Sequence, residues 1–187
     1  MAARMMDLLT PAIVSDRQNP GMTTNYERAF TERPEVLEAW GQLNGAIKEG
    51  MDLRRYELAT LAAARRLRSS YCSLAHGTVL RERFDEPVRE IALDRRSAGL
   101  DEVDVAVMDF AEKVVDDAAA IQESDLQRLR DLGLSDTDIM DVALAAAARC
   151  FFSKTLDAMG VLPDASYQEL EPELRDALVV GRPIAQS

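Results

Sequence analysis

Hydrophobic residues at helical spacing, bounded by helix-ending residues, constrain the fold of this 187-residue chain more than any other feature. After Pro34 the apolar residues recur every three or four positions, at Val36, Leu37, Trp40, Leu43 and Ile47. This spacing places them on one face of an α-helix, whereas the faces of a strand alternate at every second residue. Proline is favoured at a first helical position and glycine after a last one. We therefore expect an amphipathic helix over residues 34–50.

The rest of the chain repeats this pattern. The further helices that we expect lie over residues 51–67, from the candidate N-caps Ser69 and Ser70 to Pro87, at 103–115, from Ser124 to Gly133, from Ser135 to Gly160, and over 169–180. The alanine-rich helix that ends at Gly160 is expected to be central. No segment shows sustained alternation of β-branched residues, so the sequence predicts an all-α fold.

At 187 residues the chain fits a single domain. We expect its helical core at about 34–163, since the residues before it lack a sustained period. The N-terminal arm, residues 1–31, is expected to be a loop or short strand-like segment. The C-terminal arm, residues 164–187, is expected to carry the last short helix. A terminal arm of this kind often docks on a neighbouring subunit when a protein oligomerises.

The charge balance excludes two classes of partner. Aspartate and glutamate outnumber lysine and arginine by 33 to 22, and the net charge of −11 repels phosphate backbones and anionic lipid surfaces. The apolar runs are too short to span a bilayer, and residues 1–10 lack the apolar core of a signal peptide. We therefore expect a cytoplasmic protein with no nucleic-acid or membrane partner and with both cysteines reduced.

One short constellation carries the candidate chemistry. Glu57 is followed fifteen residues later by Cys72, and His76, the only histidine, comes four residues after the cysteine. Residues four apart share a helix face, so the thiol and the imidazole lie within reach of each other. Cys72 falls in the first turn of its helix, where the helix dipole favours a thiolate. If the chain reverses at residues 68–70, Glu57 comes near the imidazole.

Each of these residues also has a simpler interpretation when it is taken alone. Cys72 can be a small buried hydrophobe, His76 a packed histidine, and Glu57 a solvated carboxylate. Their mutual spacing favours a nucleophile with a base and a relaying carboxylate. Cys150 lies in an alanine-rich segment and is followed by Phe151 and Phe152, which indicates a core position, and it is a possible resolving thiol if the fold brings it close to Cys72.

No metal centre and no cofactor are expected. Cys72 and His76 supply at most two metal ligands, and Glu57 would complete only a weak site. The glycines are scattered and form no phosphate-binding loop after a strand.

Glu57 and the run Ser69-Ser70-Tyr71-Cys72-Ser73-Leu74-Ala75-His76 resemble a known signature, a glutamate followed by Cys-x-x-Cys-x-x-x-His. It belongs to the AhpD-like alkylhydroperoxidase and carboxymuconolactone decarboxylase superfamily. The resemblance extends from Pro34 to Pro163, and the stretches 109–113, 132–136 and 151–161 are similar to its peroxidase-related subgroup.

The resemblance implies a compact AhpD-like domain of roughly six to eight helices, in which an antiparallel helix pair carries the motif. It also implies that Cys72 is an activated thiol, that His76 and Glu57 relay its proton, and that Ser69 and Tyr71 support the site. Ser69 stands where the family has its first cysteine, so the Cys-x-x-Cys disulfide cannot form. A serine hydroxyl can instead cap the helix or donate a hydrogen bond to the thiolate. A homo-oligomer, a trimer or hexamer, is implied as well.

Three functions are compatible with these residues. In the leading hypothesis, Cys72 attacks a small hydroperoxide, becomes a sulfenic acid and is reduced by an external thiol or by Cys150. In the second, a decarboxylase-like lyase uses His76 and Glu57 for acid–base chemistry on a small lactone or organic acid. In the third, the chain is a non-catalytic oligomeric protein in which the motif only packs.

Overall fold

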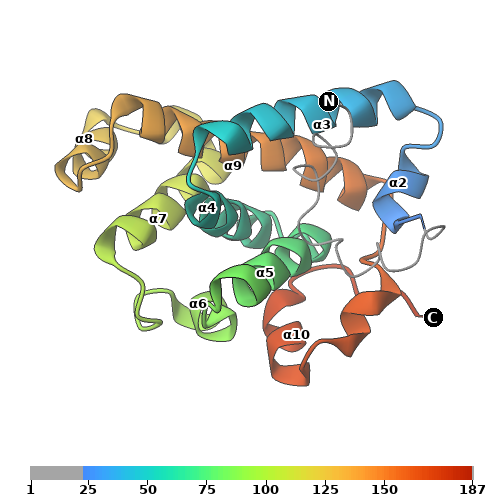
Figure 1. The fold of residues 1–187 in the computed structure, drawn as a ribbon. Helices are drawn as coiled ribbons and strands as arrows, with labels where there is room; N and C mark the ends of the chain where they lie inside the picture. Colours follow the sequence, from blue (N-terminus) through green and yellow to red (C-terminus); the bar gives the residue numbers. More distant parts are fainter. Residues whose placement is uncertain (1–22, 187) are drawn as a thin grey trace.

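Helix α4 (Leu53–Arg66) is the element around which the other helices pack in the computed structural model (Figure 1). The structure describes residues 23–186. All nine residues from Tyr56 to Ala64 are buried, because α5 (Ser70–Phe84), α7 (Glu102–Asp117) and α9 (Asp136–Ala158) lie against α4. Four of the nine are alanines, whose small side chains let neighbouring helices approach closely.

Every regular element of the described chain is helical, which confirms the predicted all-α class. The helices not yet named are α2 (Asn25–Ala29), α3 (Pro34–Gly50), α6 (Val88–Asp94), α8 (Glu123–Asp131), α10 (Pro172–Leu178) and the 3₁₀ helices η3 (Ala118–Ala120) and η4 (Ala165–Glu169). Residues 23–186 thus hold nine α-helices, more than the expected six to eight, because α2 and α6 are short helices without a long apolar period. None of the described helices is long and apolar enough to cross a membrane.

Most helix ends lie where the sequence places them. Helix α3 runs from Pro34 to Gly50, and α9 begins after Ser135, which forms a capping box with Asp138. Helix α8 begins after Gln122 instead of Ser124, because the backbone N–H of Gln122 donates to the carboxylate of Asp125.

The structure corrects the expected N-terminal arm in its described part. Residues 25–29 form helix α2 and not a loop or strand, because Thr24 and Glu27 form a capping box at its start. The backbone N–H of Asn25 donates to Asp164 over 2.7 Å and ties α2 to the C-terminal arm. The preceding part of the arm, residues 1–22, lies outside the described residues.

The expectation that the alanine-rich helix is central is wrong. One side of α9 is exposed along its length, at Met140, Leu144 and Phe151, whereas α4 is enclosed on all sides. The inward face of α3 also differs from the expected stripe. Trp40 and Ile47 are buried as expected, but Leu43 is 51% exposed, and the polar residues Asn44 and Lys48 are buried on α3 as well.

A tight turn joins α4 to α5 and makes them an antiparallel pair. Arg68 adopts a left-handed conformation with φ of 58°, and the backbone N–H groups of Arg68 and Ser69 donate to Arg65 and Ala64. These two bonds form a Schellman motif, which satisfies the last carbonyls of α4. Because α5 starts at Ser70, only three residues separate the two helices.

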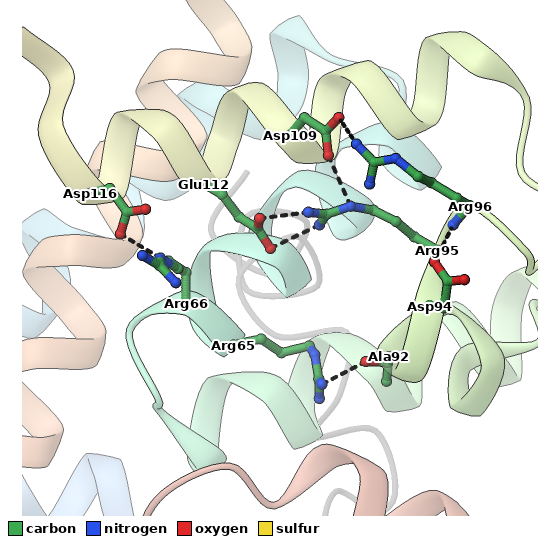
Figure 2. A network of polar contacts seen from close by, with 9 residues as sticks. All are labelled: Arg65, Arg66, Ala92, Asp94, Arg95, Arg96, Asp109, Glu112 and Asp116. Carbon is green, nitrogen blue, oxygen red and sulfur yellow. Dashed lines mark hydrogen bonds and ion pairs between the residues drawn. The ribbon is translucent and has the colours of Figure 1, made fainter. Parts of the chain in front are cut away.

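Ion pairs fix α7 against the segment that follows α6 (Figure 2). Arg95 forms a two-bond pair with Glu112 and a further pair with Asp109. Arg65 of α4 donates instead to the backbone carbonyls of Ala92 and Ala177, near the ends of α6 and α10. The guanidinium of Arg65 thereby joins three helices through uncharged acceptors.

The described C-terminal arm packs on its own chain. Leu178 of α10 is fully buried and contacts the surface of α5 at Gly77. Beyond α10, the backbone N–H groups of Val180 and Gly181 donate to the hydroxyl of Ser70 over 3.2 and 2.8 Å. The arm therefore covers the start of α5, the helix that carries the cysteine and histidine.

This docking generates a stability prediction for Gly181. A Cβ atom at this position would lie 2.0 Å from the backbone carbonyl oxygen of Arg68, so Gly181→Ala must push the arm off α5. We expect it to lower the free energy of unfolding by about 1–3 kcal/mol, measured by chemical denaturation.

Gly45→Ala is the matched control, because nothing lies within 4 Å of its added Cβ and it sits inside α3. This substitution should raise stability by about 1 kcal/mol through helix propensity. Equal stability of the two variants would contradict the close approach of the arm.

Candidate active site

The helix pair α4–α5 brings Glu57 and His76 into direct contact. The carboxylate oxygen Oε2 of Glu57 lies 2.6 Å from Nδ1 of His76. Both side chains are inaccessible, since Glu57 is 0% and His76 is 7% exposed. A carboxylate that is buried on an enclosed helix needs hydrogen-bond donors in place of water. His76 supplies one of these donors to Glu57.

Lys48 of α3 occupies the other oxygen of the same carboxylate. Its Nζ lies 3.4 Å from Oε1 of Glu57 and 4.8 Å from the centre of the Tyr56 ring. Lys48 is also buried, and its ion pair with Glu57 explains why a lysine faces inward from α3. Glu57 is thus held between an ammonium and an imidazole.

Arg149 of α9 links the imidazole to the thiol. Its Nη1 lies 3.0 Å from Nε2 of His76 and 4.0 Å from Sγ of Cys72, and its Nη2 donates to Oδ1 of Asn44 over 3.2 Å. The phenol of Tyr56 donates to the same Asn44 oxygen over 2.6 Å. The guanidinium is 4.8 Å from the ring centre of Trp40 and 5.5 Å from that of Phe152.

These contacts set the protonation of the imidazole. Arginine is a donor only, so Nε2 of His76 accepts from Arg149, and Nδ1 carries the proton that is donated to Glu57. Burial lowers the pKa of His76 to about 4, with the positive charges of Arg149 and Lys48 acting in the same direction and Glu57 opposing them. His76 is therefore a neutral imidazole near neutral pH.

Glu57 remains a carboxylate in this setting. Burial acts to raise the pKa of Glu57, but the hydrogen bond from His76 and the nearby ammonium of Lys48 outweigh it, so the pKa lies below its usual value. For Lys48 the balance differs. Burial lowers the pKa of its ammonium and Arg149 adds to this, while Glu57 acts to raise it.

The arrangement differs from the expected one at the thiol. Among the described residues no hydrogen bond joins Cys72 to His76, because the guanidinium of Arg149 contacts both groups. Cys72 is 2% exposed and lies in the first turn of α5, as expected.

The supporting residues lie around this centre. Ser69 occupies the N-cap position of α5 without a side-chain capping bond, and its hydroxyl interacts with Asp157 of α9. Tyr71 donates to Asp164 and contacts the ring of Tyr26, so it joins α5 to the two arms and not to the imidazole. Cys150 is half-buried and unpaired beside Arg149 on α9. Its role as a resolving thiol stays a prediction.

Sequence reasoning missed Asn44, Lys48 and Arg149, although each leaves a signal. Asn44 and Lys48 follow Trp40 at four-residue spacing, so all three lie on the buried face of α3. Arg149 follows an unbroken run of alanines and is a charge in an otherwise apolar helical segment. Isolated polar residues on an apolar helix face are the pattern that identifies such positions.

No metal centre is recognisable in the part of the chain that the structure describes, since no group of three or more histidine, cysteine, aspartate and glutamate side chains converges there.

Comparison with solved structures identifies similar folds. A peroxidase-related protein from Ralstonia eutropha JMP134, described as an alkylhydroperoxidase AhpD core, is 23% identical with a TM-score of 0.72, over 91% of this chain and 88% of that one. A peroxidase-related protein from Silicibacter sp. TM1040 is 25% identical with a TM-score of 0.74, over 82% and 83%.

A third similar structure is the debrominase Bmp8, as a cysteine-to-alanine variant in complex with 2,3,4-tribromopyrrole. It is 17% identical with a TM-score of 0.68, over 91% of this chain and 89% of that one. No protein-family model and no curated protein sequence matches the chain.

The buried imidazole generates a prediction for the pH dependence of stability. The pKa of His76 is about 4 in the folded protein and about 6.5 when unfolded, so the unfolded chain binds more protons between these values. We expect the free energy of unfolding to fall as pH drops from about 6.5 to 4, with a slope of at most about 1.4 kcal/mol per pH unit from this group.

His76→Gln is the comparison, because glutamine does not titrate. Denaturation curves at several pH values should show a shallower fall in the variant over this window. Parallel curves for the two proteins would contradict a histidine that is neutral in the folded state.

Proposed function

The chain shares its fold with AhpD-like peroxidase-related proteins, and from this premise we propose that it is a thiol-dependent hydroperoxide reductase whose nucleophile is Cys72. One observation carries the proposal. The sulfur of Cys72 contacts a buried guanidinium that is itself held by His76 and, through it, by Glu57. A cysteine that only filled space in the core would need no such polar surroundings.

The proposed reaction has two half-reactions. Cys72 first releases its thiol proton to water, and its thiolate sulfur attacks the terminal oxygen of a hydroperoxide ROOH. The O–O bond breaks, the cysteine becomes a sulfenic acid that keeps the hydroperoxide hydrogen, and the leaving alkoxide takes a proton from water to form ROH. A first external thiol then condenses with the sulfenic acid, releasing water and forming a mixed disulfide. A second external thiol releases the cysteine and leaves as part of an external disulfide.

We assign His76 and Glu57 a positioning role in this reaction. Arginine does not lose its proton in proteins, so a proton cannot pass from Cys72 to His76 through Arg149. The hydrogen bond from Nδ1 to Glu57 fixes the imidazole tautomer, and Nε2 then accepts from the guanidinium that contacts the sulfur. This order of groups replaces the direct relay expected from the sequence.

The reductant is an external thiol in this proposal. Ser69 occupies the place of the family's first cysteine, and a serine cannot form a disulfide. Both cysteines of the chain are free, and Cys150 is half-buried on α9 while Cys72 is enclosed. A small thiol or dithiol meets the need for two electrons without a second protein cysteine.

Substitution of Cys72 tests the proposal directly. We expect Cys72→Ser to abolish peroxide consumption with cumene hydroperoxide and dithiothreitol, because an alcohol cannot take up the peroxide oxygen as a thiol does. Mass spectrometry of peroxide-treated wild-type protein with a sulfenic-acid trap should locate the adduct on Cys72.

Cys150→Ser is the matched cysteine control and should keep its turnover, since the external thiol supplies both electrons. Full activity of Cys72→Ser would sink the proposal. A lyase that needs only His76 and Glu57 predicts that Cys72→Ala stays active on a lactone or organic acid while His76→Ala does not.

A pair of substitutions separates positioning by His76 from proton transfer by His76. Glutamine can donate to Glu57 and accept from Arg149, but it is no base, whereas alanine does neither. We expect His76→Ala to lower kcat/KM by about 10- to 100-fold, because buried partners lose their hydrogen bonds. We expect His76→Gln to recover most of that loss. Equal loss in both variants would show that the imidazole acts as the base.

A further inference from the structure

The guanidinium of Arg149 is buried without a carboxylate partner. Arg149 is 4% exposed, and the polar groups that contact its guanidinium are those of His76, Asn44 and Cys72. The rings of Trp40 and Phe152 also lie against it. Its Nε has no hydrogen-bond partner among the described residues. Burying a guanidinium is costly unless an anion faces it. These contacts supply no anion, so the positive charge of Arg149 is left uncompensated.

Two other partly buried arginines meet this need for an anion with carboxylates, whereas Arg65 donates to the backbone carbonyls of Ala92 and Ala177. Arg95 faces the carboxylates of Glu112 and Asp109 (Figure 2), and Arg54 faces those of Glu86 and Asp104. Arg149 is more deeply enclosed than either, yet no carboxylate of the described residues lies within ion-pair distance of it.

The charges around Arg149 do not balance if Cys72 is a neutral thiol. Glu57 is the single carboxylate of the cluster, and it already faces Lys48 at 3.4 Å and His76 at 2.6 Å. His76 accepts from Arg149 through Nε2 and is uncharged. One positive charge is therefore left over, and it is located on the guanidinium.

Within residues 23–186, Cys72 is the remaining ionisable side chain that makes a hydrogen-bond contact with this guanidinium. Its Sγ lies 4.0 Å from Nη1 of Arg149, and it sits in the first turn of the fifteen-residue helix α5. The N-terminal end of a helix and a neighbouring guanidinium both favour a negative sulfur.

From this placement we infer that Arg149 is the counter-ion of a Cys72 thiolate and is the group that makes this cysteine a nucleophile. The consequence of this ion pair for catalysis rests on the proposed function. When the thiolate attacks a hydroperoxide, its charge passes to the leaving alkoxide, so the site holds one negative charge before and after the O–O bond breaks. The substrate that preserves this balance is a neutral hydroperoxide and not an anionic peracid.

A stability comparison tests the ion pair without any turnover. Aspartate and asparagine have nearly the same shape, but only aspartate supplies an anion at position 72. A buried carboxylate without a cation is destabilising, so Cys72→Asp normally melts below Cys72→Asn. We expect the reverse here, with Cys72→Asp melting about 3 °C or more above Cys72→Asn.

The same pair in an Arg149→Met background provides the control. Methionine keeps the volume of the side chain but not its charge, so the order of the two melting temperatures should invert. An equal difference with and without Arg149, or Cys72→Asp below Cys72→Asn in both backgrounds, would overturn the inference.

A second measurement covers the case in which the aspartate variant does not fold. In Cys150→Ser protein, the ultraviolet absorbance of a thiolate at neutral pH reports Cys72 alone, with the double variant Cys72→Ser/Cys150→Ser as the baseline. We expect this absorbance to be present, to be kept by Arg149→Lys and to be lost in Arg149→Met. Absorbance that is missing, or that is unaffected by Arg149→Met, would contradict the pairing.

The two proposals fail in different ways. If the thiolate signals depend on Arg149 but peroxide is not consumed, the ion pair stands and the peroxidase function is wrong. If peroxide is consumed and Arg149→Met leaves both the signals and the rate unchanged, the peroxidase function stands and the ion pair is wrong.

Discussion

The enclosure of helix α4 is the constraint on which the rest of the structure depends. A helix that is covered on every side has no water with which to solvate a charge, yet Glu57 lies in its middle at 0% exposure. The carboxylate then requires partners from neighbouring helices: His76 of α5 donates a hydrogen bond to one oxygen, and the ammonium of Lys48 of α3 forms an ion pair with the other. The position of the imidazole is a consequence of this requirement.

The same constraint extends from the carboxylate to the cysteine. Because Nδ1 of His76 donates to Glu57, Nε2 is left as an acceptor that faces α9. The guanidinium of Arg149 donates to this Nε2 and also contacts the sulfur of Cys72. Asn44 and Tyr56 fix the other side of the guanidinium through a shared amide oxygen. Four helices, α3, α4, α5 and α9, contribute all of these residues. The site is therefore a product of the helix packing and not of a loop.

In the proposed reaction, the serine at position 69 makes this site a single-thiol centre and not a dithiol centre. A pair of cysteines three residues apart stores two electrons within one protein, whereas a single thiol must receive them from outside. Ser69 is fully buried and occupies the N-cap position of α5, the helix that carries Cys72.

Local pattern determined much of this protein from the sequence alone. The apolar period, Pro34, Gly50 and the capping pair of Ser135 and Asp138 located the long helices within a residue or two. These signals work because they act within one or two turns of helix. Short elements such as α2 and α6 escaped, since five to seven residues are too few to show a period.

The spacing of Glu57, Cys72 and His76 likewise pointed to a site before any geometry was known, and the turn at Arg68 brought the carboxylate and the imidazole together. Only the tertiary structure decided what stands between the imidazole and the thiol. Arg149 lies 77 residues beyond Cys72 in the chain, and its contact with the sulfur depends on how α9 packs against the α4–α5 pair. No local period in the sequence predicts this contact, because the partners of the buried Arg149 are set by the packing of helices that lie far apart in the chain.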